Sequence, residues 1–150
     1  PPVAEHASLT YSNEGRLLVF KVGGDAALPA PTIRDRSIPE RDRKGIDALS
    51  IARGEIAYNE NCAVCHGFLV RSGGAIPDLR RMSDETIAIW DQIVIDGLWS
   101  ANGMAGFGDV LTRDQSGDLL NYVLARAEED RLVAVGEKDM PQMTWLTGGD

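Results

Sequence analysis

The chain has 150 residues, of which 43% are hydrophobic, and this is enough for one domain with a modest core. Its formal net charge is −8. Residues 1–48 carry seven acidic and seven basic side chains, whereas residues 49–150 carry sixteen acidic and eight basic ones. The acidic balance argues against a nucleic-acid partner, because phosphate binding needs a basic face. No run of about eighteen apolar residues occurs, so the sequence predicts no transmembrane segment.

The N-terminal third contains two segments. Residues 1–24 include a strand-like run at 16–22, which lies between turn signals. A single strand lacks a partner here, so we expect an arm that pairs with something else or lies against the domain. Residues 25–48 combine three prolines with mixed charges, which predicts a solvated linker. The charged residues are Arg34, Asp35, Arg36, Glu40, Arg41, Asp42, Arg43 and Lys44.

Helical patterns begin at residue 49. The predicted helices run from about Ser50 to Cys62, from Ser83 to Gly97, and from Thr112 to a fading end at 128–130. Ser83 is a plausible N-cap, and Thr112 with Gln115 predicts a capping box. The apolar faces consist of Ile87, Trp90, Ile93 and Val94 in the second helix, and Leu119, Leu120, Val123 and Leu124 in the third. We therefore expect a domain over 49–127 and a tail over 128–150.

The run Cys62-Ala63-Val64-Cys65-His66 is the most specific feature of the sequence. A C-x-x-C-H motif is the attachment signature of a c-type haem. One helical turn presents both thiols to the vinyl groups at one porphyrin edge, and the histidine that follows supplies imidazole to the iron. These are the only two cysteines in the chain, so none is left for a disulfide. We predict one covalent haem c.

Other chemistries also use a C-x-x-C pair. A thioredoxin-like redox pair needs a βαβ context, which no pattern here indicates. A zinc site needs four ligands, whereas the only other histidine is His6. A chance match is disfavoured because the segments on both sides also suit a haem domain. Haem attachment is therefore the preferred interpretation.

An electron-transfer haem needs a sixth ligand, and methionine is the best candidate, because the predicted domain has no second histidine. We predict Met104, which lies in the glycine-rich stretch 102–108, where the absence of Cβ atoms lets the backbone approach a porphyrin. Met82, Met140 and Met143 are assigned to packing. Ligation by histidine and methionine raises the reduction potential and closes the iron to substrates.

Four further residues are candidates for contacts around the haem. Pro77, eleven residues after His66, could fix a backbone carbonyl that accepts the free imidazole N–H; the alternative is an ordinary turn proline. Arg80 and Arg81 match a haem propionate bidentately, although a solvent-facing pair is the alternative. The indole N–H of Trp99 could also reach a propionate, and packing alone is equally plausible.

Residues 49–127 resemble a class I cytochrome c domain, an all-α fold with three main helices around a covalent haem. Gly54 and Tyr58 match the glycine–aromatic pair on the first helix of that family. Leu119 and Tyr122 match the contact face of its last helix. The resemblance implies that these two helices cross closely, with Gly54 as the small residue at the crossing.

Longer stretches narrow this resemblance to the C-terminal cytochrome domain of quinohaemoprotein alcohol dehydrogenases. The matching stretches are residues 61–67, 72–80 and 103–111. Residues 15–24 also resemble the closing strand of the eight-bladed propeller in those enzymes, which carries pyrroloquinoline quinone (PQQ) and calcium. Almost all of the propeller is missing from this sequence. The PQQ and calcium sites therefore belong to a parent domain and cannot be assigned to these residues.

The resemblance implies an electron relay. The domain would accept electrons singly from a PQQ-containing propeller dehydrogenase domain and pass them to a small copper protein or a quinone-linked chain, with no bond-making chemistry of its own. Thioether attachment of haem implies assembly outside the cytoplasm, so we expect a periplasmic location. The alternatives are a free-standing diffusible cytochrome, an open-site haem sensor or enzyme, and a docking module in which haem is incidental.

Overall fold

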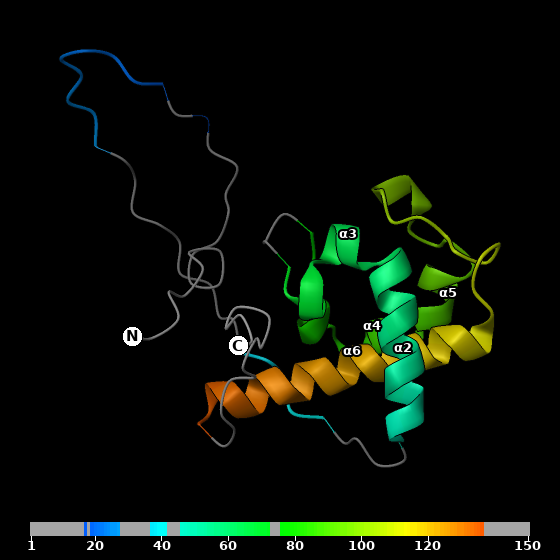
Figure 1. The fold of residues 1–150 in the computed structure, drawn as a ribbon. Helices are drawn as coiled ribbons and strands as arrows, with labels where there is room; N and C mark the ends of the chain where they lie inside the picture. Colours follow the sequence, from blue (N-terminus) through cyan, green and yellow to red (C-terminus); the bar gives the residue numbers. More distant parts are fainter. Residues whose placement is uncertain (1–16, 18, 28–36, 42–45, 73–75, 137–150) are drawn as a thin grey trace, which may run out of the picture.

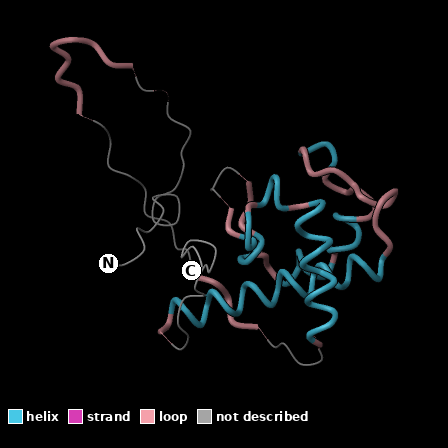
Figure 2. The backbone as a smooth tube through the Cα atoms, in the orientation of Figure 1, coloured by secondary structure: helices cyan, strands magenta, loops and turns pink. Residues whose placement is uncertain are grey.

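The computed structural model describes residues 17, 19–27, 37–41, 46–72 and 76–136. The predicted all-α fold is confirmed, since none of these residues lies in a strand (Figure 2). The long α6 crosses α2, and the shorter elements lie on both sides of α2 (Figure 1). Within the described residues, no helix has the length and apolar character needed to cross a membrane. The elements are α2 (Ala48–Asn61), α3 (Ala63–His66), η1 (Phe68–Val70), η2 (Leu79–Arg81), α4 (Asp84–Ala88), α5 (Trp90–Val94), η3 (Ser100–Asn102) and α6 (Arg113–Ala134).

The crossing of α2 and α6 depends on Gly54. A Cβ atom at this position would lie 2.0 Å from the backbone oxygen of Asp118 and 2.9 Å from the Cβ of Tyr122, so only glycine permits this approach. Beside the contact, the rings of Tyr58 and Tyr122 lie with their centroids 5.4 Å apart. Both tyrosines and Leu119 are buried. The close crossing that the family resemblance implied is present.

Polar side chains surround this crossing. Asp118 on α6 accepts hydrogen bonds from Arg53 Nε at 2.5 Å and from Ser50 Oγ at 2.6 Å. Asn121 donates to the same Ser50 oxygen at 2.8 Å. Helix α2 itself begins two residues earlier than predicted, because the carboxylate of Asp47 accepts two backbone N–H groups as an N-cap.

The prediction of a single helix from Ser83 to Gly97 is wrong. Ser83 is the N-cap, and its hydroxyl accepts from the backbone N–H of Thr86 at 3.3 Å. The helix then breaks at Ile89, whose φ of −109° and ψ of 19° are not helical, and α5 starts at the next residue. After the break, the buried Trp90 donates its indole N–H to Ser116 Oγ on α6 at 3.0 Å. The break is therefore followed directly by a tertiary contact with α6.

Helix α6 begins as predicted and ends later. Both hydrogen bonds of the capping box between Thr112 and Gln115 are present. The helix does not fade at 128–130 but continues to Ala134. Side-chain pairs three and four residues apart support these last turns: Arg131 with Glu128, and Arg126 with Asp130.

The segment before α2 differs from the predicted picture at Arg41, whereas the role of the strand-like run stays a prediction. The described residues of the strand-like run, Leu17 and 19–22, have no regular structure and are exposed. A lone strand has no ladder of hydrogen bonds to hold it. In the linker, Arg41 is not solvent-facing: its side chain is 13% exposed, donates to the backbone oxygen of Met82 and lies 3.5 Å from Asp84. This part of the linker therefore packs against the start of α4.

Some predictions lie outside the described residues. These are the N-terminal part of the arm, most of the charged linker residues, residues 73–75 of the matching stretch 72–80, and the tail from 137 onward with Met140 and Met143. The boundaries of the arm, linker, domain and tail therefore stay predictions.

The helix crossing can be tested with two glycine substitutions. We expect Gly54→Ala to lower the free energy of unfolding by about 2 kcal/mol or more, because the new methyl group would collide with the backbone of α6. Gly117→Ala on α6 is the matched control, since its Cβ would meet nothing within 4 Å. It should instead stabilise the fold by about 0.5–1 kcal/mol through reduced chain entropy. Urea unfolding measures both, and equal effects of the two substitutions would contradict this account of the crossing.

Candidate haem site

The two cysteines lie on one turn of backbone: Cys62 joins α2 to α3, and Cys65 lies within α3. The backbone N–H groups of Cys65 and His66 both donate to the carbonyl of Cys62, at 3.1 and 2.9 Å, as the motif predicts. Both thiols are free; Cys62 is buried and Cys65 is exposed. Burial, and secondarily the nearby Cys65, raises the pKa of Cys62 to about 11. Cys62 is therefore a protonated thiol near neutral pH.

The imidazole of His66 is buried and held by Pro77. Its Nδ1 lies 3.2 Å from the carbonyl oxygen of Pro77. A carbonyl only accepts, so Nδ1 carries the hydrogen and Nε2 is the nitrogen with a free lone pair. Burial lowers the pKa of His66, and the bond to Pro77 and the charge of Asp78 only partly offset this. The ring is therefore neutral, which is the form that binds a metal.

The chain turns sharply after His66. Gly67 has a φ of 82°, and a Cβ there would lie 2.2 Å from the backbone oxygen of Arg71. The hydroxyl of Tyr58 on α2 donates to the Gly67 carbonyl at 2.7 Å. Leu69 and Val70 follow with φ values of 55° and 62°. The left-handed region is unfavourable for a β-branched residue, so neighbouring contacts must hold Val70 in place.

Met104 lies against the apolar core. It is partly buried and packs on a cluster that includes Cys62 and Trp90. Its backbone N–H donates to the carbonyl of Trp99 at 3.3 Å. The glycine-rich loop is closely packed at Gly106, where a Cβ would lie 2.9 Å from the Cα of Gly97, but not at Gly103, where a Cβ would meet nothing within 4 Å.

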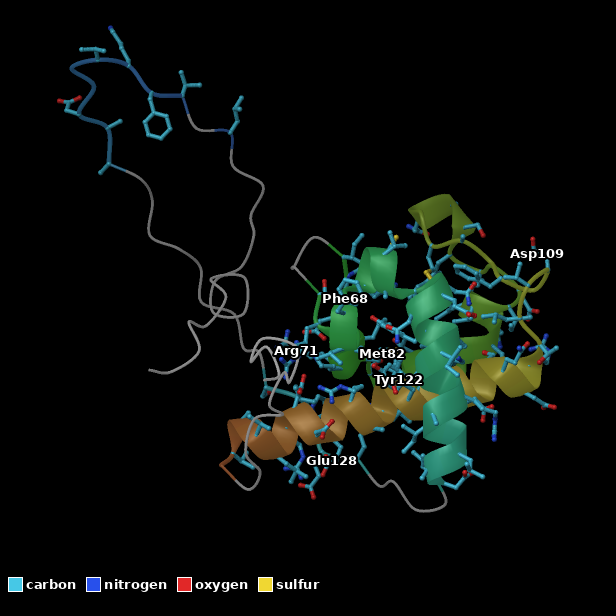
Figure 3. All side chains as sticks on the ribbon, in the orientation of Figure 1. Phe68, Arg71, Met82, Asp109, Tyr122 and Glu128 are labelled. Carbon is cyan, nitrogen blue, oxygen red and sulfur yellow. The ribbon has the colours of Figure 1, made fainter. Side chains whose placement is uncertain are left out.

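The assignment of Met82 to packing is confirmed, because its side chain is buried in the core (Figure 3). The role of Met104 as an iron ligand stays a prediction. The same is true of a propionate contact from Trp99, which is 39% exposed.

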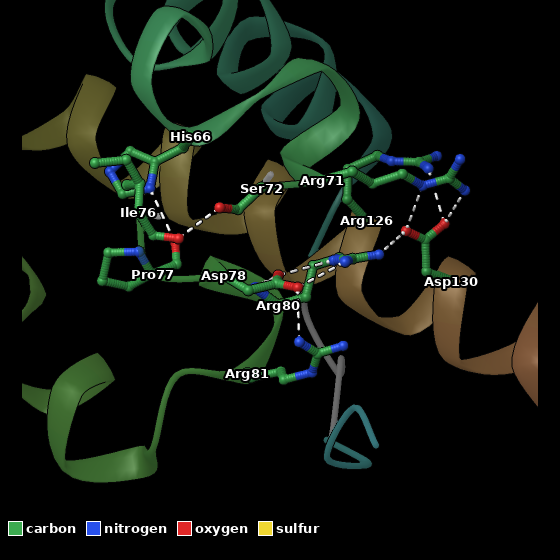
Figure 4. A network of polar contacts seen from close by, with 10 residues as sticks. All are labelled: His66, Arg71, Ser72, Ile76, Pro77, Asp78, Arg80, Arg81, Arg126 and Asp130. Atoms are coloured by element: carbon green, nitrogen blue, oxygen red, sulfur yellow. Dashed lines mark hydrogen bonds and ion pairs between the residues drawn. The ribbon is translucent and has the colours of Figure 1, made fainter. Parts of the chain in front are cut away.

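Arg80 has partners that the sequence did not indicate. Its Nε and Nη2 donate to the two carboxylate oxygens of Asp78, at 2.9 and 2.6 Å. Its Nη1 donates to Asp130 at 2.7 Å. Arg81 also pairs with Asp78, at 3.0 Å (Figure 4). All three guanidinium nitrogens of Arg80 therefore contact carboxylates, and propionate binding by Arg80 and Arg81 stays a prediction.

Asp130, on the last turns of α6, is the centre of this network. Its carboxylate accepts two hydrogen bonds from Arg71, at 2.9 and 2.7 Å, one from Arg80 and one from Arg126 at 3.0 Å (Figure 4). Burial alone would raise its pKa, but the hydrogen bonds and charges of these arginines lower it. No local motif marks Asp130, which sequence analysis placed at a fading helix end.

The side chains fit a covalent haem. Two free thiols and a neutral histidine with Nε2 available are the groups that attach a haem c and bind its iron. Within the described residues, no three His, Cys, Asp or Glu side chains gather into a site for a bare metal ion.

Comparisons with known proteins agree with this fit. Residues 50–123 match the family model described as "Cytochrome C oxidase, cbb3-type, subunit III". Quinohemoprotein alcohol dehydrogenase ADH IIB of Pseudomonas putida is 38% identical over 120 residues, which cover 79% of this chain and 17% of that protein. The 1-butanol dehydrogenase (cytochrome c) of Thauera butanivorans is 34% identical, over 78% of this chain and 17% of that protein.

A solved structure is similar as well. The quinohemoprotein alcohol dehydrogenase ADHIIG from P. putida HK5 superposes with a TM-score of 0.59 and 33% identity, over 76% of this chain and 16% of that one. The chain thus spans about a sixth of the length of these relatives.

The fold, the C-x-x-C-H turn and these matches together define an electron-transfer domain with haem c as its cofactor. Residues 50–123 form a domain of the cytochrome c family. Within that family, the resemblance to the cytochrome domain of quinohaemoprotein alcohol dehydrogenases, predicted from three sequence stretches, is confirmed.

The lowered pKa of Asp130 makes the fold sensitive to acid. The ionised carboxylate contributes stability above its ordinary pKa of 3.8, and this contribution is lost as the pH falls through the lower pKa of the folded state. We expect Asp130→Asn to cost about 3–5 kcal/mol at neutral pH, because it breaks a buried pairing. The difference from the parent chain should narrow below about pH 4.

Urea unfolding between about pH 7 and about pH 2.5 measures this difference. Asp109→Asn, at an exposed carboxylate on the loop before α6 (Figure 3), is the control and should unfold like the parent chain. A cost of Asp130→Asn that stays constant over the whole range would contradict the assignment.

Proposed function

We propose that this chain relays single electrons from a PQQ-containing dehydrogenase domain to an external acceptor, through a haem c with His66 and Met104 as axial ligands. The haem supplies the one-electron iron couple when bound. The observation that carries the proposal is the buried His66 ring, whose Nδ1 is committed to Pro77 while Nε2 is left for the iron. The turn that ends in His66 also contains both thiols.

The residues of the chain have distinct parts in this function. Cys62 and Cys65 hold the porphyrin by thioether bonds. Pro77 fixes the ring plane of His66 and makes its Nε2 a stronger donor. Met104 closes the sixth position with a thioether, which favours ferrous iron. The apolar core would keep water away from the iron, so that little solvent has to reorganise when the iron changes its oxidation state.

The partners are inferred from the relatives. Their names join an alcohol dehydrogenase to a haem protein, and this chain spans only about a sixth of their length. We propose that a propeller domain with PQQ and calcium is the electron donor, and that residues 15–24 and the linker lead from it. The acceptor is a small copper protein or a quinone-linked chain. We infer a periplasmic location, because thioether attachment of haem implies assembly outside the cytoplasm.

An optical spectrum of the haem-loaded chain tests the relay. Ligation by His66 and Met104 predicts a low-spin spectrum, a far-red sulfur-to-ferric-iron band, and no binding of carbon monoxide. A high-spin spectrum that responds at once to carbon monoxide would replace the relay with an open-site sensor or enzyme.

The sixth ligand is tested by Met104→Ala. This substitution should open the iron, give a high-spin ferric spectrum, allow carbon monoxide binding and lower the reduction potential, because the thioether is lost. Met82→Leu is the control: Met82 is buried in the core, and a change that conserves volume should leave the spectrum unchanged. An unchanged low-spin ferric spectrum in Met104→Ala would refute the assignment.

A further inference from the structure

One carboxylate on α6 holds two separate segments of the haem-binding region. Arg71 follows the strained residues Leu69 and Val70, and Arg80 follows Pro77 within η2. These arginines lie nine positions apart, yet both donate to Asp130, fifty or more residues further along the chain. Asp130 therefore ties together the chain on both sides of the loop that includes Pro77 (Figure 4).

The contacts continue from this carboxylate to His66. Arg80 is bound on its other side by Asp78, whose carboxylate also accepts the backbone N–H of Arg80 at 3.1 Å and caps η2. The peptide bond between Pro77 and Asp78 contains the carbonyl that accepts from His66 Nδ1. On the near side of the loop, Ser72 donates to the carbonyl of Ile76 at 2.5 Å.

The burial of these groups makes the arrangement rigid. Asp130, Arg80 and Arg126 are all less than a tenth exposed, and the paired Arg71 side chain is 21% exposed. Buried charges keep their positions because any movement leaves one of them without its partner. Leu69 and Val70 also remain in the left-handed region only if their neighbours fix them, and Arg71 is the next residue.

We propose that Asp130 is a positioning residue for the axial histidine: through Arg71 and Arg80 it holds the Pro77 carbonyl in place and so fixes the orientation and hydrogen bond of His66. The inference rests on the proposed ligation of haem by His66. Asp130 touches neither the histidine nor the haem-binding thiols in the contacts described above, and it acts only through the two arginines.

The test uses the full haem-loaded chain and two arginine variants that remove the same charge. Arg71→Gln breaks the bidentate pair between the loop and Asp130 and leaves Asp130 bound to Arg80 and Arg126. Arg131→Gln is the matched control, because Arg131 forms a bidentate pair with Glu128 within α6. NMR of the ferrous form measures hydrogen exchange at His66 Nδ1, and the ferric haem methyl shifts report the ring orientation.

We expect exchange at His66 Nδ1 to be about tenfold faster in Arg71→Gln, with a changed pattern of haem methyl shifts. Arg131→Gln should match the parent chain in both. Parent-like values in Arg71→Gln, or equal changes in the two variants, would overturn the proposal.

The folded Asp130→Asn variant provides a second test, which measures the midpoint reduction potential. It should raise the midpoint potential, because a weaker hydrogen bond at Nδ1 makes His66 a poorer donor to ferric iron. Glu128→Gln removes the same charge from the same helix and should shift the potential much less. Equal shifts would indicate a general effect of charge and overturn the proposal. A parent chain without a low-spin histidine-ligated spectrum would instead refute the proposed function.

Discussion

The steric contact at Gly54 is the constraint on which the rest of the structure depends. Because α2 and α6 touch through backbone at this point, everything attached to either helix is placed relative to the other. Helix α2 leads directly into the turn of Cys62, and its Tyr58 holds the Gly67 carbonyl after His66. Helix α6 extends from the same crossing to Asp130. The crossing at Gly54 therefore sets the position of the haem-binding turn relative to Asp130.

The buried charges near Asp130 contribute more to geometry than to net stability. Removing guanidinium groups from water costs several kcal/mol each, and pairing with carboxylates does little more than offset that cost. An apolar cluster of the same volume would stabilise the fold as well. Apolar packing has no directional preference, whereas hydrogen bonds do. The guanidinium of Arg80 bridges Asp78 and Asp130, with each of its nitrogens at a defined distance from a carboxylate oxygen. Such a network is suited to holding a loop in one orientation.

The features that sequence analysis predicted correctly are those formed by residues close together in the sequence. The C-x-x-C-H turn, the N-cap at Ser83 and the capping box at Thr112 all involve residues within a few positions of one another. The break at Ile89 was missed because no glycine or proline marks it, and the contact of Trp90 with α6 that follows it joins residues far apart in sequence. Asp130 and Arg41 were missed because decisive partners of each lie forty or more residues away: Arg71 and Arg80 for Asp130, and Met82 for Arg41. Charged residues at a helix end or in a proline-rich segment look solvated when only their neighbours in sequence are considered.

The two predicted axial positions differ in how the fold holds them. On the histidine side, the ring is fixed by a side-chain hydrogen bond to Pro77, and the backbone behind it by Tyr58 and the buried arginines. On the methionine side, Met104 packs on the apolar cluster, its backbone N–H donates to Trp99, and Gly106 lies close to Gly97. Electron transfer is favoured when the ligands move little between oxidation states. The histidine side is therefore held by directional hydrogen bonds and buried charges, whereas the methionine side is held by apolar packing and a close approach of backbone.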